Sequence, residues 1–193
     1  MGPKVISVFS LAAQVGLNDG VLVLRPKATE MFELSLTQYG RPLMGDVYLC
    51  DLSNIVDCSG SFVDEFILGW QRLIRQVDNT LFILTNISED VEYTTASALN
   101  LRNKIDKDNL ILVAKHSEKY CIIGEKIERN TLDVFEMMAE GIHITARLVA
   151  DRFTVELNSA GNRLKKLYDA HATMRLEQSI ENGGKYEYYL PHL

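Results

Sequence analysis

The chain has 193 residues, a formal net charge of −6 and a pI near 5.3, and its composition is 47% hydrophobic and 24% charged. That length accommodates one large domain or two small ones, and the composition excludes disordered and fibrous proteins. No apolar run approaches the ~20 residues of a membrane span, and the N-terminal segment lacks the pattern of a secretory signal, so we expect a cytoplasmic protein without a membrane contact.

The first 124 residues alternate apolar strand-like runs with helical patterns. Strands are predicted at residues 21–24, 47–52, 81–86, 110–114 and 120–123. Helices are predicted at residues 30–38, 62–77 and 88–102, and the middle one has an apolar stripe wide enough to cover a sheet. Strands separated by helices predict an α/β domain with a mixed or parallel sheet over residues 1–124.

The pattern changes near residue 125, and a second domain is predicted over residues 125–193. Its first helix comes from EKIERNTLDVFEMMAEG, with Thr131 as the N-cap and Gly141 as the stop. Thr145 can cap a second helix that ends at Phe153. Beyond a third helix, the β-rich runs ATMRLEQ and KYEYYLP flank SIENGG and predict a hairpin.

The third helix, predicted over residues 157–170, has two contrasting faces. Its predicted apolar face consists of Leu157, Ala160, Leu164 and Leu167. The opposite face carries amide, hydroxyl and basic side chains that can bond base edges and phosphates: Asn158, Ser159, Asn162, Arg163 and Lys166, with Lys165 at its margin. We expect Arg175 and Lys185 to lie near the same face, which is therefore a candidate DNA-binding surface.

Motifs for catalysis, cofactor binding and metal binding are missing from the sequence. Cys50, Cys58 and Cys121 form no CxxC pair, and the four histidines lack metal-ligand spacing, so neither a disulfide framework nor a metal site is expected. The GxGxxG, P-loop and GxSxG patterns are absent as well. We therefore expect a protein that is not an enzyme and has no cofactor.

The segment DVFEMMAEGIHITARLVADRFTVELNSAGNRLKKLYDAHATMRLEQSIENGGKYEYYLP resembles prokaryotic winged helix-turn-helix transcriptional regulators, in which three helices are followed by a β-hairpin wing. The resemblance implies binding of double-stranded DNA, with the third helix in a major groove and the wing turn at Asn182 to Lys185 near the backbone. Two positions depart from the family pattern. Glu156 stands where a small polar cap is usual, and His171 replaces the glycine that often ends the third helix.

The charge balance argues against strong DNA binding by one chain. Residues 125–193 hold nine Lys or Arg against eleven Asp or Glu, and residues 1–124 hold eleven against fifteen. Because non-specific DNA affinity comes from neutralising phosphates, we expect weak binding by a monomer and a homodimer that presents two helices. The alternative is a winged helix that serves as a protein–protein adaptor.

The segment VYLCDLSNIVDCSGSFVDEFILGWQRL resembles STAS and STAS-like domains, the fold of anti-sigma factor antagonists, and the resemblance extends over residues 45–115. In that family the serine just before the helix accepts a phosphoryl group, and gapless matching implies Ser61. Ser59 is implied instead if Asp57-Cys58-Ser59-Gly60 is matched to the family's Asp-Ser-Ser-Gly with a shorter loop. The alternative is that Ser61 only caps the helix.

Nearby carboxylates bear on this phosphorylation hypothesis. A phosphate would gain from the helix N-terminus, but Asp57, Asp64 and Glu65 are expected to repel it. That conflict could itself make a switch.

Together these observations predict a two-domain transcriptional regulator, in which the STAS-like domain senses or docks a regulatory partner and the winged helix binds DNA. The segment KHSEKYCIIGEKIER is expected to join the domains as a strand pair that runs into the first helix. The alternative function is a protein–protein switch that does not bind DNA and works with a kinase-like or anti-sigma-type partner.

Overall fold

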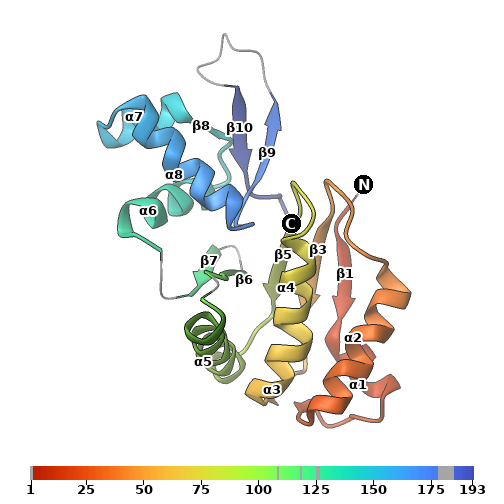
Figure 1. Cartoon of the computed structure of the whole chain (residues 1–193). Coiled ribbons are helices and arrows are strands. Elements are labelled where there is room, and N and C mark those ends of the chain that lie inside the picture. Colours follow the sequence, from red (N-terminus) through yellow and green to blue (C-terminus); the bar gives the residue numbers. More distant parts are fainter. Residues whose placement is uncertain (1, 108, 118, 125–126, 178–184) are drawn as a thin grey trace.

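The computed structural model describes residues 2–107, 109–117, 119–124, 127–177 and 185–193, and a five-stranded sheet forms the centre of its N-terminal half (Figure 1). The strand order is β1-β3-β5-β6-β7, with bounds Lys4–Ser7, Val47–Asp51, Leu81–Thr85, Leu112–His116 and Lys119–Ile123. All neighbouring pairs are parallel except β6 and β7, which are antiparallel. The predicted α/β fold with a mixed sheet is confirmed.

The predicted strand at residues 21–24 differs most from the structure. Only Val21–Leu22 form a strand, β2, which pairs in parallel with β4 (Asp57–Cys58) in a separate two-stranded sheet. One edge strand of the main sheet is instead β1, a strand that the sequence patterns did not predict. The small β2–β4 sheet leads directly into the serine turn, residues 59–61.

The N-terminal helices cover one face of the main sheet. They are α1 (Val8–Gln14), α2 (Arg25–Tyr39), α5 (Glu89–Asp106) and a continuous stretch made of α3 (Gly60–Phe62), the π-helical η1 (Val63–Ile67) and α4 (Leu68–Ile74). Trp70 is fully buried in this first core, where it packs against Phe82 and Tyr48 and donates a hydrogen bond to Ser35 Oγ at 2.9 Å. The polar end of this large side chain is therefore satisfied inside the core.

The opposite face of the sheet packs against the C-terminal half of the chain. Side chains alternate along β5, so that Phe82 and Leu84 enter the first core while Leu81 and Ile83 enter a second one. The second core also contains Val113 of β6 and buried side chains of the C-terminal helices. Burial on both faces explains why β5 reads as a continuous apolar run.

Within residues 127–177 and 185–193, the C-terminal half has three helices and a three-stranded antiparallel sheet. The helices are α6 (Arg129–Ala139), α7 (Ala146–Phe153) and α8 (Leu157–Asp169). The strands are β8 (Ile144–Thr145), β9 (Met174–Glu177) and β10 (Tyr186–Tyr189), in the order β8-β10-β9. Of the predicted wing turn at Asn182 to Lys185, residues 182–184 lie outside the described residues.

The helix caps test two local predictions. Thr145 caps α7 as expected, because its Oγ accepts a hydrogen bond from Leu148 N at 3.2 Å. The prediction that Thr131 caps the preceding helix is wrong: α6 begins after Glu128, and Thr131 is a buried residue of its first turn. Glu156, the residue that departs from the usual small polar cap, precedes α8 without a side-chain capping bond.

The end of α8 is bonded directly to the turn that precedes β5. Tyr168 donates its hydroxyl to Asp78 Oδ1 at 2.6 Å, and Asn79 Oδ1 accepts from the backbone N–H of Arg175 at 2.9 Å. His171, in the left-handed region at φ 54°, places Nδ1 3.2 Å from the carbonyl oxygen of Thr80. The two halves are thus joined by these contacts, and in the chain α6 follows β7, the edge strand of the main sheet.

We expect His171 to make the protein less stable in mild acid. Burial lowers the pKa of His171 below its ordinary value, against the opposing effect of the Thr80 carbonyl, and the Arg75 guanidinium lowers it further. The unfolded chain therefore binds more protons as the pH falls through the ordinary histidine pKa of about 6.5, and the free energy of unfolding decreases until the folded-state pKa is passed. Urea unfolding at a series of pH values should show this dependence reduced in His171→Gln. The exposed His192→Gln is the control, and an equal reduction in both variants would contradict the assignment.

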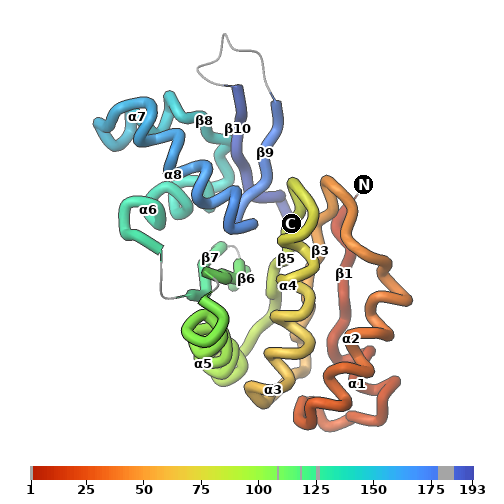
Figure 2. Tube along the Cα trace, viewed as in Figure 1, coloured from red at the N-terminus to blue at the C-terminus, as the bar shows by residue number. Residues whose placement is uncertain are grey.

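The C-terminal segment returns to the sheet after β10 (Figure 2). Pro191 O accepts a hydrogen bond from the Tyr120 hydroxyl at 2.6 Å, and the Leu193 carbonyl oxygen accepts one from Lys115 Nζ at 2.9 Å. Among the described residues, no helix is long and apolar enough to cross a membrane.

Candidate functional site

Helix α8 exposes one polar stripe and buries the side opposite to it. The exposed side chains are Asn158, Ser159, Asn162, Lys165 and Lys166, while Arg163 is partly buried. The predicted apolar face is right for Ala160, Leu164 and Leu167, which are buried in the second core. The prediction is wrong for Leu157, which is 43% exposed, because the residue lies in the first turn where the helix projects beyond that core.

The two lysines of the stripe have acidic neighbours. Lys165 forms an ion pair with Asp169, and Lys166 Nζ lies 3.0 Å from Glu128 Oε1. All four side chains are more than half exposed, and exposed pairs of this kind contribute only about 0–1 kcal/mol, so they can exchange partners readily. No described residue forms an ion pair with Arg163, which makes it the strongest candidate for a phosphate or guanine contact.

Arg175 lies away from this stripe, contrary to prediction. Its guanidinium carbon is 3.9 Å from the ring centre of Tyr168 and 4.3 Å from that of Tyr186, and a guanidinium nitrogen is 3.8 Å from Asp78 Oδ2. Tyr168 belongs to the buried side of α8. Arg175 therefore helps to hold the junction between the halves, which sequence spacing alone could not reveal.

Lys185 remains exposed at the start of β10, where its Nζ lies 3.3 Å from Glu177 Oε1 of the neighbouring strand. Two further cations, Arg147 and Arg152 on α7, are exposed and were not predicted. The periodicity of the helix ARLVADRF could have predicted their exposure, because Val149 and Ala150 are its buried residues and the two arginines lie on other sides of the helix.

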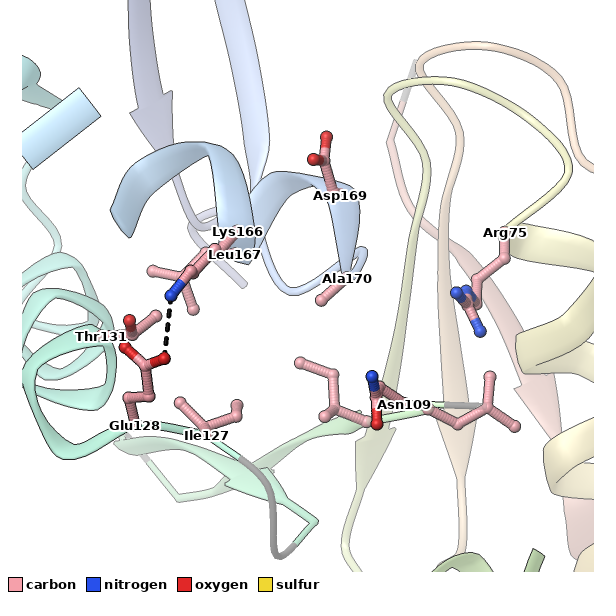
Figure 3. Close-up of a pocket in the computed structure, with 11 residues that line it drawn as sticks. Arg75, Asn109, Ile127, Glu128, Thr131, Lys166, Leu167, Asp169 and Ala170 are labelled. Atoms are coloured by element: carbon pink, nitrogen blue, oxygen red, sulfur yellow. Dashed lines mark hydrogen bonds and ion pairs between the residues drawn. The ribbon is translucent and has the colours of Figure 1, made fainter. Parts of the chain in front are cut away.

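A pocket of about 450 Å³ opens between the C-terminal end of α8 and the α/β half (Figure 3). The ion pair of Lys166 with Glu128 closes one side, and Arg75 stands on the opposite wall with Asn109 between them. Ile111 and Leu167 provide part of its apolar lining. The pocket thus combines an apolar lining with charged groups at its rim, as small-molecule sites do.

In the serine turn, Ser59 rather than Ser61 occupies the capping position. Ser59 Oγ accepts a hydrogen bond from Phe62 N at 3.2 Å, and the two serine hydroxyl oxygens are 3.0 Å apart. Ser61 lies inside the first helical turn, so the prediction that it caps the helix is wrong. The reason is that the helix begins at Gly60, earlier than its apolar stripe indicated.

Behind the serine turn, three arginines surround the carboxylate of Asp64. Arg72 from α4, Arg102 from α5 and Arg25 from α2 all form ion pairs with it, the first at 3.0 Å and the last at 3.4 Å. Burial opposes ionisation of Asp64, but hydrogen bonds and charge from Arg102 and Arg72 outweigh it and lower its pKa to about 2. Asp64 is thus neutralised by arginines, and Glu65 is paired with Arg25. The expected repulsion of a phosphate by these two carboxylates is correspondingly weaker.

Apolar side chains flank the serine turn on the surface. Leu24 is 61% exposed and Val56 is 62% exposed, and they adjoin the strands β2 and β4 that lead into the turn. Gly20, with φ of 75°, supports this arrangement, because an added Cβ would lie only 2.3 Å from the Asn54 carbonyl oxygen. The serine turn and the segments that adjoin β2 and β4 thus expose both hydroxyl and apolar side chains to a protein partner.

Comparison of the chain with protein-family models, with curated proteins and with solved structures finds no significant match.

Proposed function

We propose that the chain is a DNA-binding transcriptional regulator, in which residues 125–193 form a winged helix-turn-helix domain and residues 1–124 form a STAS-like domain. Three helices followed by the hairpin strands β9 and β10, with β8 added beside β10, support the first assignment. Helix α8 is the proposed reading helix in the major groove. Neither half is assigned a catalytic role.

The polar stripe of α8 is the observation that carries the proposal. Its opposite side is fixed in the second core, so the stripe has a constant orientation. Asn158 and Asn162, one helical turn apart, present amides that can bond adenine, and Arg163 can bond guanine or phosphate. Apart from Leu157 in the first turn, the exposed residues of α8 are polar or charged, which favours a polar partner such as DNA over a hydrophobic protein surface.

Because the chain is acidic, its affinity for DNA must come from lysine and arginine side chains placed at the contact surface and not from its net charge. We propose a cytoplasmic homodimer that presents two copies of α8 to two half-sites, which would raise the affinity of an otherwise weak monomer. Light scattering combined with gel filtration would give the mass of the particle in solution.

Reversing two charges on α8 is expected to weaken DNA binding by about tenfold or more, because each lost phosphate contact and each added repulsion acts on the electrostatic part of the affinity. The measurement is fluorescence polarisation with random genomic DNA fragments at low and moderate salt, comparing the parent with the double variant Arg163→Glu/Lys166→Glu. The matched control is Arg41→Glu/Lys104→Glu, which makes the same change in net charge at exposed positions outside the winged helix.

Salt-sensitive binding that is lost in the α8 variant and kept in the control would support the proposal. Equal losses in both variants would indicate a non-specific charge effect. Absence of binding by the parent even at low salt would overturn it.

A second candidate function is a protein–protein switch without DNA binding, and the surface at the serine turn favours it. Ser59 and Ser61 are only partly buried, and Leu24 and Val56 offer exposed apolar contact beside them. A kinase-like or anti-sigma-type protein that docks there could phosphorylate either serine. In the first proposal the same surface receives the regulatory partner, so the DNA titration is what separates the two functions.

A further inference from the structure

Three potential metal ligands come together where α5 covers the β6–β7 hairpin. They are Glu92 of α5, His116 at the end of β6 and Cys121 within β7. Their ligand atoms all lie within 4.8 Å of one another, and His116 Nε2 is 2.9 Å from Glu92 Oε2. Within the part of the chain that the structure describes, this is the one group of three such side chains with this geometry.

The register of the hairpin explains how the group forms. Ala114 is paired with Cys121, and His116 is paired with Lys119, so His116 and Cys121 project from the same face two positions apart. Ala114 on this face is buried in the first core, which also contains Val91 and Leu99 of α5. Helix α5 therefore brings Glu92 to the pair.

We propose that Glu92, His116 and Cys121 bind one divalent transition-metal ion of the zinc class, with a fourth coordination position left to water or to an exogenous ligand. One sulfur, one imidazole nitrogen and one carboxylate oxygen are the donor types that zinc accepts. Tetrahedral coordination at the usual zinc bond lengths separates such donor atoms by about 3.4–3.6 Å. The structure holds the three ligand atoms within 4.8 Å of one another, so side-chain rotations of these residues can bring them to those separations.

The Glu92 carboxylate contributes a negative charge to the group, which favours a cation beside it. A bound ion displaces the thiol proton of Cys121, because thiolate is the form of cysteine that ligates metals. His116 and Glu92 are each about one-third or more exposed, which leaves the fourth position open toward solvent.

A metal at this position would connect helix α5 to both strands of the hairpin at the edge of the main sheet. The chain leaves β7 for α6, so the ion would strengthen the attachment of the second half to the first. The three proposed ligands lie within residues 1–124, so metal binding does not depend on DNA binding.

The test is a titration of reduced, untagged, metal-stripped full-length protein with Zn²⁺ by calorimetry and with Co²⁺ by absorption spectroscopy. We expect one equivalent to bind with proton release, and Co²⁺ to give visible bands of tetrahedral coordination together with a thiolate-to-cobalt charge-transfer band. The variants Cys121→Ser, His116→Gln and Glu92→Gln should each weaken the affinity more than about tenfold, because removal of an outer-shell partner alone costs 10–100-fold. Cys121→Ser should also abolish the charge-transfer band.

The matched control is His143→Gln, which removes the histidine of another exposed His–Glu pair, that of His143 with Glu187 at 3.4 Å, and should leave binding unchanged. Circular dichroism of every variant shows whether it is folded. No binding by the folded parent, or a charge-transfer band that survives in folded Cys121→Ser, would overturn the proposal. Equal loss in His143→Gln would do the same.

Discussion

Replacement of Asp64 by alanine is expected to lower the free energy of unfolding by about 3 kcal/mol. Removal of one partner from a buried ion pair costs roughly 3–5 kcal/mol, because the remaining charge loses its compensation. Only 8% of the Asp64 side chain is exposed, but its three arginine partners are 31–51% exposed and keep part of their hydration. We therefore expect the lower end of that range, which corresponds to a fall in Tm of about 6–12 °C for a chain of this size.

The acid sensitivity of this stabilisation provides a second measurement. The folded-state pKa of Asp64 is lowered to about 2, so its contribution is present above the ordinary aspartate pKa and is lost as the pH falls from about 4 toward 2. Urea unfolding across that range should show a shallower loss of stability in Asp64→Ala than in the parent. The control is Asp106→Ala, which removes an exposed i,i+4 partner of the same Arg102 and should cost about 0.5 kcal/mol or less. Equal costs for the two substitutions would contradict a buried arginine–carboxylate centre.

The Asp64 cluster also shows what sequence reasoning could and could not supply. The sequence placed Asp64 correctly in a helix that follows the serines, and its charge was expected to repel a phosphate at the turn. Its partners Arg25 and Arg102 lie 39 and 38 residues away along the chain, on α2 and α5. No local pattern indicates that such distant residues converge, so the cluster required the packed structure.

The presence or absence of a local sequence pattern also separates the strands that were predicted from the strand that was missed. Residues 47–52 and 81–86 were predicted well, because continuous apolar runs reflect burial on both faces of a central strand. The short strand β1 and helix α1 follow one another without a loop and give no repeated pattern. Ser7 was an available signal, since its Oγ accepts a hydrogen bond from Ser10 N at 3.4 Å as the cap of α1.

Among the candidate sites, the stripe on α8 was predictable, because the periodicity of a single helix determines which of its residues share a face. Asn158 and Asn162 are exposed as expected, whereas the position of Arg175 depends on how β9 meets the turn at Asp78. The group of Glu92, His116 and Cys121 was not predicted at all, because its members come from a helix and two strands. Spacing in the sequence indicates metal ligands only when they lie in the same helix, strand or turn.

Replacement of Phe135 by alanine is expected to lower the free energy of unfolding by about 3–5 kcal/mol, the usual cost of truncating a fully buried phenylalanine. Phe135 of α6 is 0% exposed in the second core, which it shares with Ile83 of the sheet and Leu164 of α8. If this core makes the two halves one cooperative unit, the substitution must also destabilise the α/β half. Trp70, the single tryptophan of the chain, reports on that half through its fluorescence.

The urea midpoint of Trp70 fluorescence should therefore shift in Phe135→Ala as far as the midpoint of the far-ultraviolet circular dichroism signal. The control is Glu136→Ala, an exposed neighbour in the same helix, which should change either midpoint by the equivalent of less than about 0.5 kcal/mol. An unchanged fluorescence midpoint in Phe135→Ala would mean that residues 125–193 unfold independently. Coincident shifts would instead mean that the two halves unfold as one unit, because the same packing supports β5 and orients α8. In that case the second core provides a physical connection between residues 1–124 and α8. A partner or a metal ion bound to residues 1–124 can then alter the proposed DNA-binding face through this core.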